Sequence, residues 1–259
     1  MTDFTTTING LDLSLFARIE SQSTDDDKRT LLACEVAVRE MHPGYAYLEI
    51  GSYLGGSIQP HLIDPDCKTI FSIDKRPPSQ PDARGFDWKY DNNSTARMIR
   101  ELAAIGDTKK IQTIDGDSAS IDPALVTDAI QLCFVDGEHT DSAAKADFEF
   151  CLKVLDDNGA IVFHDAQIIY NGLAACIEKL QALGTPFVAY PLPNAIFVIE
   201  IGDFPMHKNA EIQQLLRNNH ASYLYALKEN DEYRRFATGF PFGILRRLKL
   251  RIRGGNVSR

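Results

Sequence analysis

No run of apolar residues in this chain approaches the roughly 18 needed to span a bilayer, which excludes an integral membrane protein. The N-terminus has neither a basic region nor an apolar core segment, so we expect no secretory signal. The five cysteines are widely spaced and form no CxxC pair, which argues against a disulfide framework and against a cysteine zinc site. Together these absences predict a protein of the reducing cytoplasm.

The charge of the chain is unevenly distributed. Eight of the 27 Lys and Arg residues lie in residues 234–259, which contain none of the 36 Asp and Glu residues. Residues 1–233 therefore carry 19 basic and 36 acidic side chains, a net charge of −17. A body this acidic offers no broad surface for the phosphates of a nucleic acid. Its length of 259 residues and its 44% hydrophobic content predict one large folded domain with appendages.

Short apolar runs alternate with amphipathic segments along most of the chain. Seven runs are predicted as strands: residues 45–50, 69–73, 111–114, 132–135, 160–163, 187–190 and 195–201. The helices are predicted at residues 26–41, 94–105, 141–155 and 172–183, with Asn158-Gly159 as a helix stop. This alternation predicts an α/β fold, a Rossmann-like, doubly wound and mostly parallel seven-stranded sheet that ends in an antiparallel hairpin. We place a helical N-terminal extension at residues 1–42, the catalytic domain at 43–203 and a helical C-terminal extension at 204–259.

A glycine-rich turn follows the first predicted strand. Glu49 ends the strand, and Gly51, Gly55 and Gly56 would let the backbone approach a ligand closely. Their spacing is not that of GxGxxG, and a carboxylate in this position disfavours a pyrophosphate but suits a cationic ligand. A tight strand-to-helix turn without any ligand explains the glycines equally well.

The next two strands also end in acidic or small polar residues. Asp74 follows the second strand at the distance from the glycine turn at which an acid can hold both hydroxyls of a ribose, although an ordinary turn aspartate is the alternative. The third strand leads into Asp115-Gly116-Asp117-Ser118, which could border an adenine or begin a helix.

Two histidines and two aspartates follow the fourth and fifth strands. Asp136 and His139 come after the fourth strand, and His164 and Asp165 come directly after the fifth. Because the carboxyl ends of parallel strands meet at one edge of a sheet, these side chains should lie close together. Histidine can accept a proton near neutral pH, and paired carboxylates suit a hard divalent cation.

The ordered set of strand-end motifs resembles the class I S-adenosylmethionine-dependent methyltransferases, specifically the subgroup with D-G-x-H after the fourth strand and H-D after the fifth. The glycine motif is similar to that of catechol-type O-methyltransferases, and the resemblance covers roughly residues 30–200. It implies a cofactor site made of Glu49, Gly51, Ser52, Tyr53, Gly55, Ser57, Asp74, Gly116, Asp117, Ser118 and Asp136. In that site the glycine motif would line the methionine end, Asp74 would hold the ribose, and residues 116–118 would border the adenine.

The resemblance also implies how a hydroxyl acceptor would be activated. Asp136 and Asp165 occupy the positions of divalent-metal ligands, which gives a predicted set of Asp136, His164 and Asp165 for Mg²⁺ or another divalent cation. His139 stands where catechol-type enzymes carry a catalytic lysine, so the predicted catalytic residues are His139, Asp136 and His164. Since His164 replaces the usual acid, a metal-free site with His139 or His164 as general base remains the alternative.

Two further segments have open interpretations. Residues 75–93 form a long aperiodic loop with Trp88 and Tyr90, which we read as part of the cofactor or acceptor pocket, a surface loop being the alternative. This loop resembles those of methyltransferases that act on sugars or glycans, so we expect a sugar, a glycan or another small natural product as acceptor. The basic tail, residues 240–253, fits a packing or homodimer contact, or attraction to anionic lipid that would place the protein peripherally on a membrane.

Two other functions fit the sequence less well than that of a methyltransferase. A nicotinamide-dependent Rossmann enzyme is disfavoured by the broken GxGxxG pattern, by Glu49 and by the lack of YxxxK at any of the nine tyrosines. A non-catalytic cofactor-binding scaffold in a biosynthetic complex is disfavoured by the two histidines and two carboxylates at the strand ends.

Overall fold

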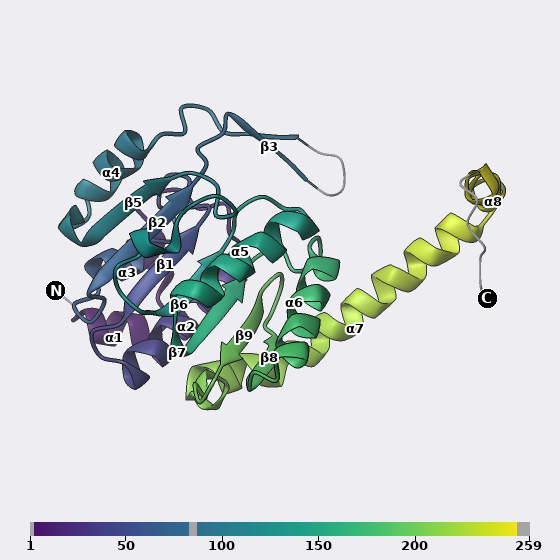
Figure 1. Cartoon of the computed structure of the whole chain (residues 1–259). Helices are drawn as coiled ribbons and strands as arrows, with labels where there is room; N and C mark the ends of the chain where they lie inside the picture. Colours follow the sequence, from purple (N-terminus) through teal and green to yellow (C-terminus); the bar gives the residue numbers. More distant parts are fainter. Residues whose placement is uncertain (1–2, 83–86, 253–259) are drawn as a thin grey trace. The chain divides into compact units, whose positions relative to one another are not determined.

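The computed structural model describes residues 3–82 and 87–252 (Figure 1). It divides into two compact units, residues 1–216 and 217–259, and α7 (Ala210–Thr238) begins in the first and continues in the second. Among the helices of the described residues, none combines the length and apolar character that crossing a membrane requires. The domain boundaries predicted at residues 42 and 203 remain predictions.

A seven-stranded sheet forms the centre of the first unit, with the strand order β5-β2-β1-β6-β7-β9-β8. The strands are β1 (Ala46–Ile50), β2 (Thr69–Asp74), β5 (Ile111–Asp115), β6 (Ile130–Val135), β7 (Leu155–Phe163), β8 (Phe187–Pro191) and β9 (Phe197–Ile201). The first five run parallel, while β9 pairs antiparallel with β7 and β8. The Rossmann-like fold, the mostly parallel sheet and the terminal hairpin are therefore confirmed.

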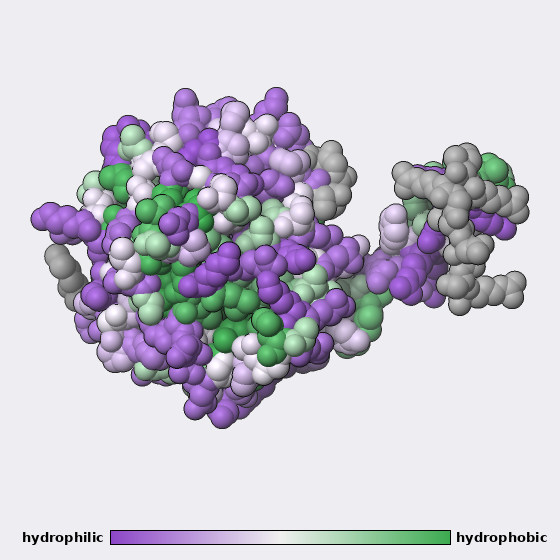
Figure 2. Space-filling model, viewed as in Figure 1, coloured by the Kyte–Doolittle hydropathy of each residue, from purple (hydrophilic) through white to green (hydrophobic). Residues whose placement is uncertain are grey.

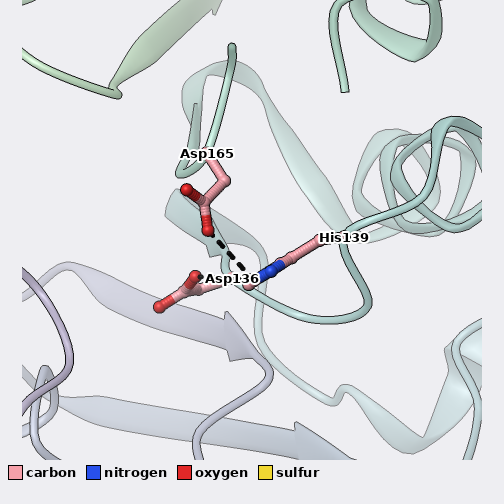
Figure 3. Close-up of side chains that lie close together, drawn as sticks. All are labelled: Asp136, His139 and Asp165. Carbon is pink, nitrogen blue, oxygen red and sulfur yellow. Dashed lines mark ion pairs between the residues drawn. The ribbon is translucent and has the colours of Figure 1, made fainter. Parts of the chain in front are cut away.

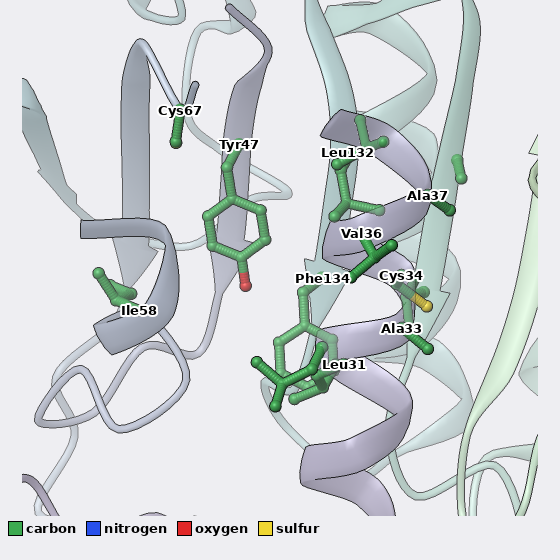
Figure 4. Close-up of a cluster of buried hydrophobic side chains, with 14 of the residues drawn as sticks. Leu31, Ala33, Cys34, Val36, Ala37, Tyr47, Ile58, Cys67, Leu132 and Phe134 are labelled. Atoms are coloured by element: carbon green, nitrogen blue, oxygen red, sulfur yellow. The ribbon is translucent and has the colours of Figure 1, made fainter. Parts of the chain in front are cut away.

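Helices cover both faces of this sheet. One buried cluster includes side chains of α1 (Phe4–Asn9), α2 (Asp25–Met41), α3 (Gln59–Ile63) and α4 (Thr95–Ala103). The cluster on the other face includes side chains of α5 (Asp141–Val154) and α6 (Tyr170–Leu183), the two helices in front of the sheet in Figure 1. Figure 4 shows the first cluster where Leu31 and Val36 of α2 lie beside Leu132 and Phe134 of β6. Strands buried on both faces explain why they appear in the sequence as short continuous apolar runs.

The start of α2 is fixed by its capping. Thr24 accepts a hydrogen bond from the backbone N–H of Asp27, and the Asp27 carboxylate accepts one from the backbone N–H of Thr24. This reciprocal cap satisfies two donors at the helix start, and the acidic first turn complements the helix dipole. The packing of α2 against the sheet brings the Asp27 side chain, which is 1% exposed, to the edge where the site lies.

Two predicted elements differ from the structure. The fifth strand is longer than predicted, because Asn158-Gly159, expected to follow a helix, lies inside β7, where Gly159 pairs with Ile201 of β9. Residues 75–93, expected to lack periodic structure, contain a short antiparallel pair, β3 (Ser79–Pro81) and β4 (Asp87–Lys89). The tail, whose period was ambiguous, forms α8 (Phe242–Ile252).

Candidate active site

The site lies where the strand order reverses, at the carboxyl ends of β1 and β6. Open α/β sheets bind ligands at such a switch point, because the two flanking connections leave the sheet in opposite directions. Backbone hydrogen bonds tie the ends together: Gly51 donates to Ile73 (2.8 Å), and Asp136 donates to Ile50 (2.9 Å). A cavity of about 540 Å³ opens here, which is within the range of about 300–1,000 Å³ typical of small-molecule sites.

Three segments outside the sheet complete the walls of this cavity. They are the stretch before α2, the β3–β4 insertion and the turn between β8 and β9, which supply Glu20, Ser21, Gln22, Thr24, Gln80, Trp88, Tyr90, Asn93, Asn194 and Ala195. The prediction that Trp88 and Tyr90 belong to the pocket agrees with this lining. Trp88 is 44% exposed, whereas Tyr90 is buried and meets Tyr53 edge-on, with ring centroids 5.2 Å apart.

At two positions of the turn after β1, glycine is required for steric reasons. Gly51 has a φ of +93°, and a Cβ there would come closer than 3.0 Å to the carbonyl oxygen of Asp136. A Cβ on Gly56 would lie 2.9 Å from the backbone of Glu20 and Ser21, which is also too close. These glycines therefore let the β1 turn approach the β6 end and the segment before α2. Gly51, Gly56 and the predicted residues Ser52, Tyr53 and Ser57 line the cavity.

Glu49 lies beneath this turn and is fully buried. Its carboxylate accepts hydrogen bonds from the hydroxyls of Tyr47 (2.6 Å) and Ser57 (2.7 Å). Burial, partly offset by these two hydrogen bonds, raises the pKa of Glu49 to about 7. Glu49 is thus connected to the cavity through Ser57 rather than lining it, and Gly55 lies against Leu102 behind the turn.

Asp74 lies at the cavity wall with most of its surface covered. Its carboxylate accepts backbone hydrogen bonds from Tyr53 (2.8 Å) and Arg76 (2.7 Å), and the Arg76 guanidinium lies 3.3 Å from it. Arg76 also donates to the Tyr53 carbonyl, so it links the β1 turn to the β2 end. Sequence analysis missed Arg76, because nothing in its neighbourhood distinguishes it from a surface arginine.

A small pocket of about 20 Å³ adjoins the main site and is lined by Gly116 and Ser118, as well as by Gly51 and Asp74. Ser118 donates a hydrogen bond to Asp147 of α5, whose pKa burial raises to about 6. The predicted residue Asp117 lines neither cavity; its carboxylate pairs with Lys75 at 2.9 Å.

The two predicted histidines and two predicted aspartates do come together. Figure 3 shows three of them, Asp136, His139 and Asp165. His139 Nε2 lies 3.1 Å from Asp165 Oδ2 and 3.8 Å from Asp136 Oδ1. His164 Nδ1 lies 3.0 Å from Asp136 Oδ1 and 3.3 Å from Asp165 Oδ2. All four residues line the cavity, so this cluster is the candidate chemical centre.

Asp27 was missed as a member of this cluster. Its carboxylate lies 3.3 Å from His164 Nε2, and Asn194 donates to both of its oxygens at 2.9 Å. The sequence contained only the helix-start signal of Asp27, because its contact with the fifth strand end arises from packing. His164 is therefore held between the carboxylates of Asp27 in α2, Asp136 just after β6 and its own neighbour Asp165.

The charges in this cluster determine whether the pKa of each member is raised or lowered. Burial lowers the pKa of a histidine, but for His164 the carboxylates of Asp136, Asp165 and Asp27 outweigh burial and hold the pKa well above its usual value. For His139 the same balance, with Asp136 and Asp165, also raises the pKa. For Asp136 the effects are reversed: burial raises the pKa of the carboxyl group, but the two neighbouring histidines outweigh burial and hold that pKa at about 2.

Asp136, His139 and Asp165 form a donor set that could hold a divalent cation. One ligand atom from each lies within 4.8 Å of the others, and the two oxygens and one nitrogen suit several divalent ions. The predicted set contained His164 in place of His139. In the structure, both nitrogens of His164 already face carboxylates, whereas His139 completes the group. Which set binds metal remains a prediction.

The region around this cluster matches a known protein family. Residues 48–166 match a family model described as a methyltransferase domain. The match begins in β1 and ends one residue after Asp165. It contains the glycine turn, Asp74 and the two histidines and two aspartates after β6 and β7, but neither Asp27 nor the segment before α2.

Two solved structures of methyltransferases share the fold of this chain. The O-methyltransferase NovP has a TM-score of 0.59 and 11% identity, and the match covers 77% of this chain and all of that one, 100%. CalS11, described as a TDP-rhamnose 3'-O-methyltransferase of calicheamicin biosynthesis, has a TM-score of 0.50 and 17% identity, with 77% of this chain and 94% of that chain covered. At these identities the likeness shows the fold alone. No curated protein sequence matches the chain.

Proposed function

We propose that this protein is an S-adenosylmethionine-dependent O-methyltransferase acting on a hydroxyl of a sugar, a glycan or another small natural product. The observation that carries the proposal is one cavity that joins the glycine turn after β1 to the His–Asp cluster after β6 and β7. The first element suits the cofactor, and the second suits removal of a proton from an alcohol.

The residues of the cavity fit this cofactor. The Gly51 turn has no side chain facing the Asp136 backbone, and the Asp74 carboxylate is available at the wall for a pair of hydroxyls. The small pocket of Gly116 and Ser118 lies beside Asp74, where a base attached to that ribose would point. S-adenosylmethionine, when bound, supplies a methyl group that its sulfonium has already activated.

What the chain must add is alignment and deprotonation. We assign to His139 the removal of the acceptor proton, with Asp136 and Asp165 stabilising the imidazolium that results. His164 would hold the two aspartates in place from the opposite side. Because the pKa of His139 is raised from 6.5, the imidazole stays protonated to a higher pH. Only the neutral imidazole can accept the proton, so turnover should increase as His139 deprotonates, with the midpoint of the pH profile above 6.5.

A divalent cation on Asp136, His139 and Asp165 would acidify the acceptor hydroxyl instead. In that arrangement the His139 lone pair is used as a ligand and is not free to accept a proton. The two routes are therefore exclusive for His139. Chelation distinguishes them: EDTA abolishes turnover in the metal route and leaves it unchanged in the histidine route.

The cofactor class is tested by thermal unfolding of the full chain with S-adenosylhomocysteine, with NAD as the control ligand, each in EDTA and in Mg²⁺. A ligand at about 100 times its Kd adds roughly 2.7 kcal/mol of stability. Stabilisation by S-adenosylhomocysteine and not by NAD is expected, and the reverse result would refute the proposal. Tight cofactor binding without methyl transfer to any hydroxyl would instead indicate a non-catalytic scaffold.

A further inference from the structure

From the charges of the cavity, and resting on the proposed function, we infer that the acceptor carries no phosphate or carboxylate and that a basic amine strengthens its binding. Five carboxylates line the cavity: Glu20, Asp27, Asp74, Asp136 and Asp165. Among its described lining residues, none is Lys or Arg. The lining histidines His139 and His164 each face carboxylates of the cluster, so carboxylates remain in excess. No Lys or Arg among the described lining residues is there to receive the phosphates of a sugar linked to a nucleotide diphosphate.

The two basic residues that follow Asp74 do not supply that charge. Lys75 pairs with Asp117 at 2.9 Å and with Glu138 at 3.3 Å, and it lines the small side pocket instead of the main cavity. Arg76 is 8% exposed and is held by Asp74 and the Tyr53 carbonyl. Both side chains would have to break several contacts before either could meet a phosphate.

The neutral residues of the cavity suit hydroxyl groups. Gln22, Gln80, Asn93 and Gln167 contribute amides, which both donate and accept hydrogen bonds without adding charge. Trp88 presents a half-exposed ring beside them, an apolar surface on which a sugar ring can pack. Amides, one exposed aromatic ring and excess carboxylates together favour an amino sugar or a neutral glycoside.

Glu20 offers the sharpest test of the charge argument. It lines the cavity from the segment before α2, it is exposed, and it is outside the His–Asp cluster. Changing it to Gln or Lys therefore alters the charge of the wall without removing a group assigned to catalysis. Glu178, exposed on α6, provides the matched control for both substitutions.

The experiment measures binding of three probes to the full chain saturated with S-adenosylhomocysteine: glucosamine, glucose and glucose 1-phosphate, in EDTA and in Mg²⁺. We expect glucosamine to bind at least about tenfold more tightly than glucose 1-phosphate, since one unit of charge at cavity distances accounts for such a factor. Glu20→Gln should narrow this ratio by about threefold and Glu20→Lys by about tenfold, while the Glu178 variants leave it unchanged.

Each outcome has a separate meaning. The inference about the acceptor is overturned if glucosamine binds no more tightly than glucose 1-phosphate, in EDTA or in Mg²⁺. It is also overturned if neither probe binds. A ratio unaffected by Glu20→Lys does the same. Failure of S-adenosylhomocysteine to bind refutes the proposed function instead, so the two failures are distinguishable.

A second, independent observation concerns the 217–259 unit. α8 presents Ile244, Leu245 and Leu248 at 47%, 58% and 49% exposure, along one helical stripe at positions i, i+1 and i+4. Arg246 and Lys249 flank that stripe in the sequence. Figure 2 shows hydrophobic and hydrophilic residues side by side on this unit.

The end of α7 supports this helix. The rings of Phe236 and Phe242 pack with centroids 4.6 Å apart, and the backbone N–H of Gly243 donates to Gly239 at 2.7 Å. A Cβ on Gly243 would come closer than 3.0 Å to Thr238, so glycine allows the corner between α7 and α8. The corner presents a short amphipathic helix whose apolar stripe has no described partner within its unit.

We propose that α8 docks onto an anionic lipid surface. Residues 234–259 hold eight basic residues and no acidic ones, while the preceding chain has a net charge of −17, so an anionic surface attracts this segment alone. An amphipathic helix with cations beside an apolar stripe lies in the plane of such a surface, with the apolar side chains inserted. A helix of 11 residues is marginal in water, so lipid contact would also stabilise it.

The test is co-sedimentation of the full chain with phosphatidylcholine vesicles, with and without phosphatidylglycerol. We expect binding only with phosphatidylglycerol, loss of about a hundredfold in affinity in Arg246→Gln/Arg247→Gln/Lys249→Gln, and release in high salt. A second variant, Leu245→Ser/Leu248→Ser, should also lose binding, whereas the control Leu125→Ser, exposed in the first unit, should not. Equal pelleting of all variants, no pelleting of the wild type, or retention of nucleic acid or a second copy by this helix would overturn the proposal.

Discussion

The contact of Gly51 with the end of β6 allows a prediction whose magnitude can be worked out from the structure. In Gly51→Ala, the alanine must adopt a φ near +93°, which costs about 1–2 kcal/mol for a residue with a Cβ. The new methyl group also meets the Asp136 carbonyl closer than 3.0 Å, and overpacking of this kind adds about 1–3 kcal/mol. We therefore expect a total loss of about 2–5 kcal/mol in the free energy of unfolding.

Gly44 provides a matched control for this substitution. It has a φ of +84°, yet a Cβ there would meet nothing within 4 Å. Gly44→Ala thus carries the backbone cost and the same change in unfolded-chain entropy, without the steric clash. The difference between the two variants isolates the contact with Asp136, and we expect it to be about 1–3 kcal/mol.

The assay is urea unfolding of both variants, followed by titration with S-adenosylhomocysteine. For a unit of this size, 1 kcal/mol corresponds to about 2–4 °C in Tm, so thermal unfolding gives an independent check. Gly51→Ala should lose cofactor binding because relief of the clash moves either the glycine turn or the Asp136 backbone, whereas Gly44→Ala should retain it. Equal destabilisation of the two variants with intact binding in both would refute the steric argument.

Three further predictions address chemistry, acceptor binding and pH. His139→Ala should lower kcat by about 10²–10⁴-fold and leave the affinity for S-adenosylhomocysteine unchanged in calorimetry; unchanged turnover would remove it from the mechanism. Trp88→Ala should raise the acceptor KM more than it lowers kcat, and an effect on cofactor affinity alone would contradict its placement at the acceptor. Burial raises the pKa of Glu49 from 4.5 to about 7, so the folded protein binds this proton more tightly than the unfolded chain does. The free energy of unfolding of the ligand-free protein should therefore fall by about 3 kcal/mol as the pH rises from 4.5 to about 7. Glu49→Gln should flatten this part of the stability curve, and an unchanged curve would show that Glu49 ionises normally.

Much of the fold could be predicted because its signals are local. Strands buried on both faces appear as short apolar runs, and the acidic run Asp25-Asp26-Asp27 indicates a helix start near residue 26. The start of β7 could not be predicted, because Asn158-Gly159 usually ends a helix and is held in a strand here only by pairing with β9. The β3–β4 pair was missed for a similar reason, since each of its strands has only three residues.

The site divides in the same way. Asp136, His139, His164 and Asp165 could be predicted to meet, because parallel strands bring their carboxyl ends to one edge whatever the rest of the chain does. Asp27 could not, because a helix cap contains no information about which strand end it will face. Its 3.3 Å approach to His164 depends on how α2 packs against the sheet.

Patterns along the chain are enough to predict the seven strands of the main sheet, the chemical groups at their ends and the contrast between an acidic body and a basic tail, because these features depend on residues close together in sequence. The fold adds that His139 joins Asp136 and Asp165 while His164 lies against Asp27, and that Lys75 and Arg76 are paired elsewhere. Those facts arise from side chains far apart in sequence that share one cavity wall. Their positions follow from the packing of α2 and the β3–β4 insertion around the sheet, which no local pattern encodes.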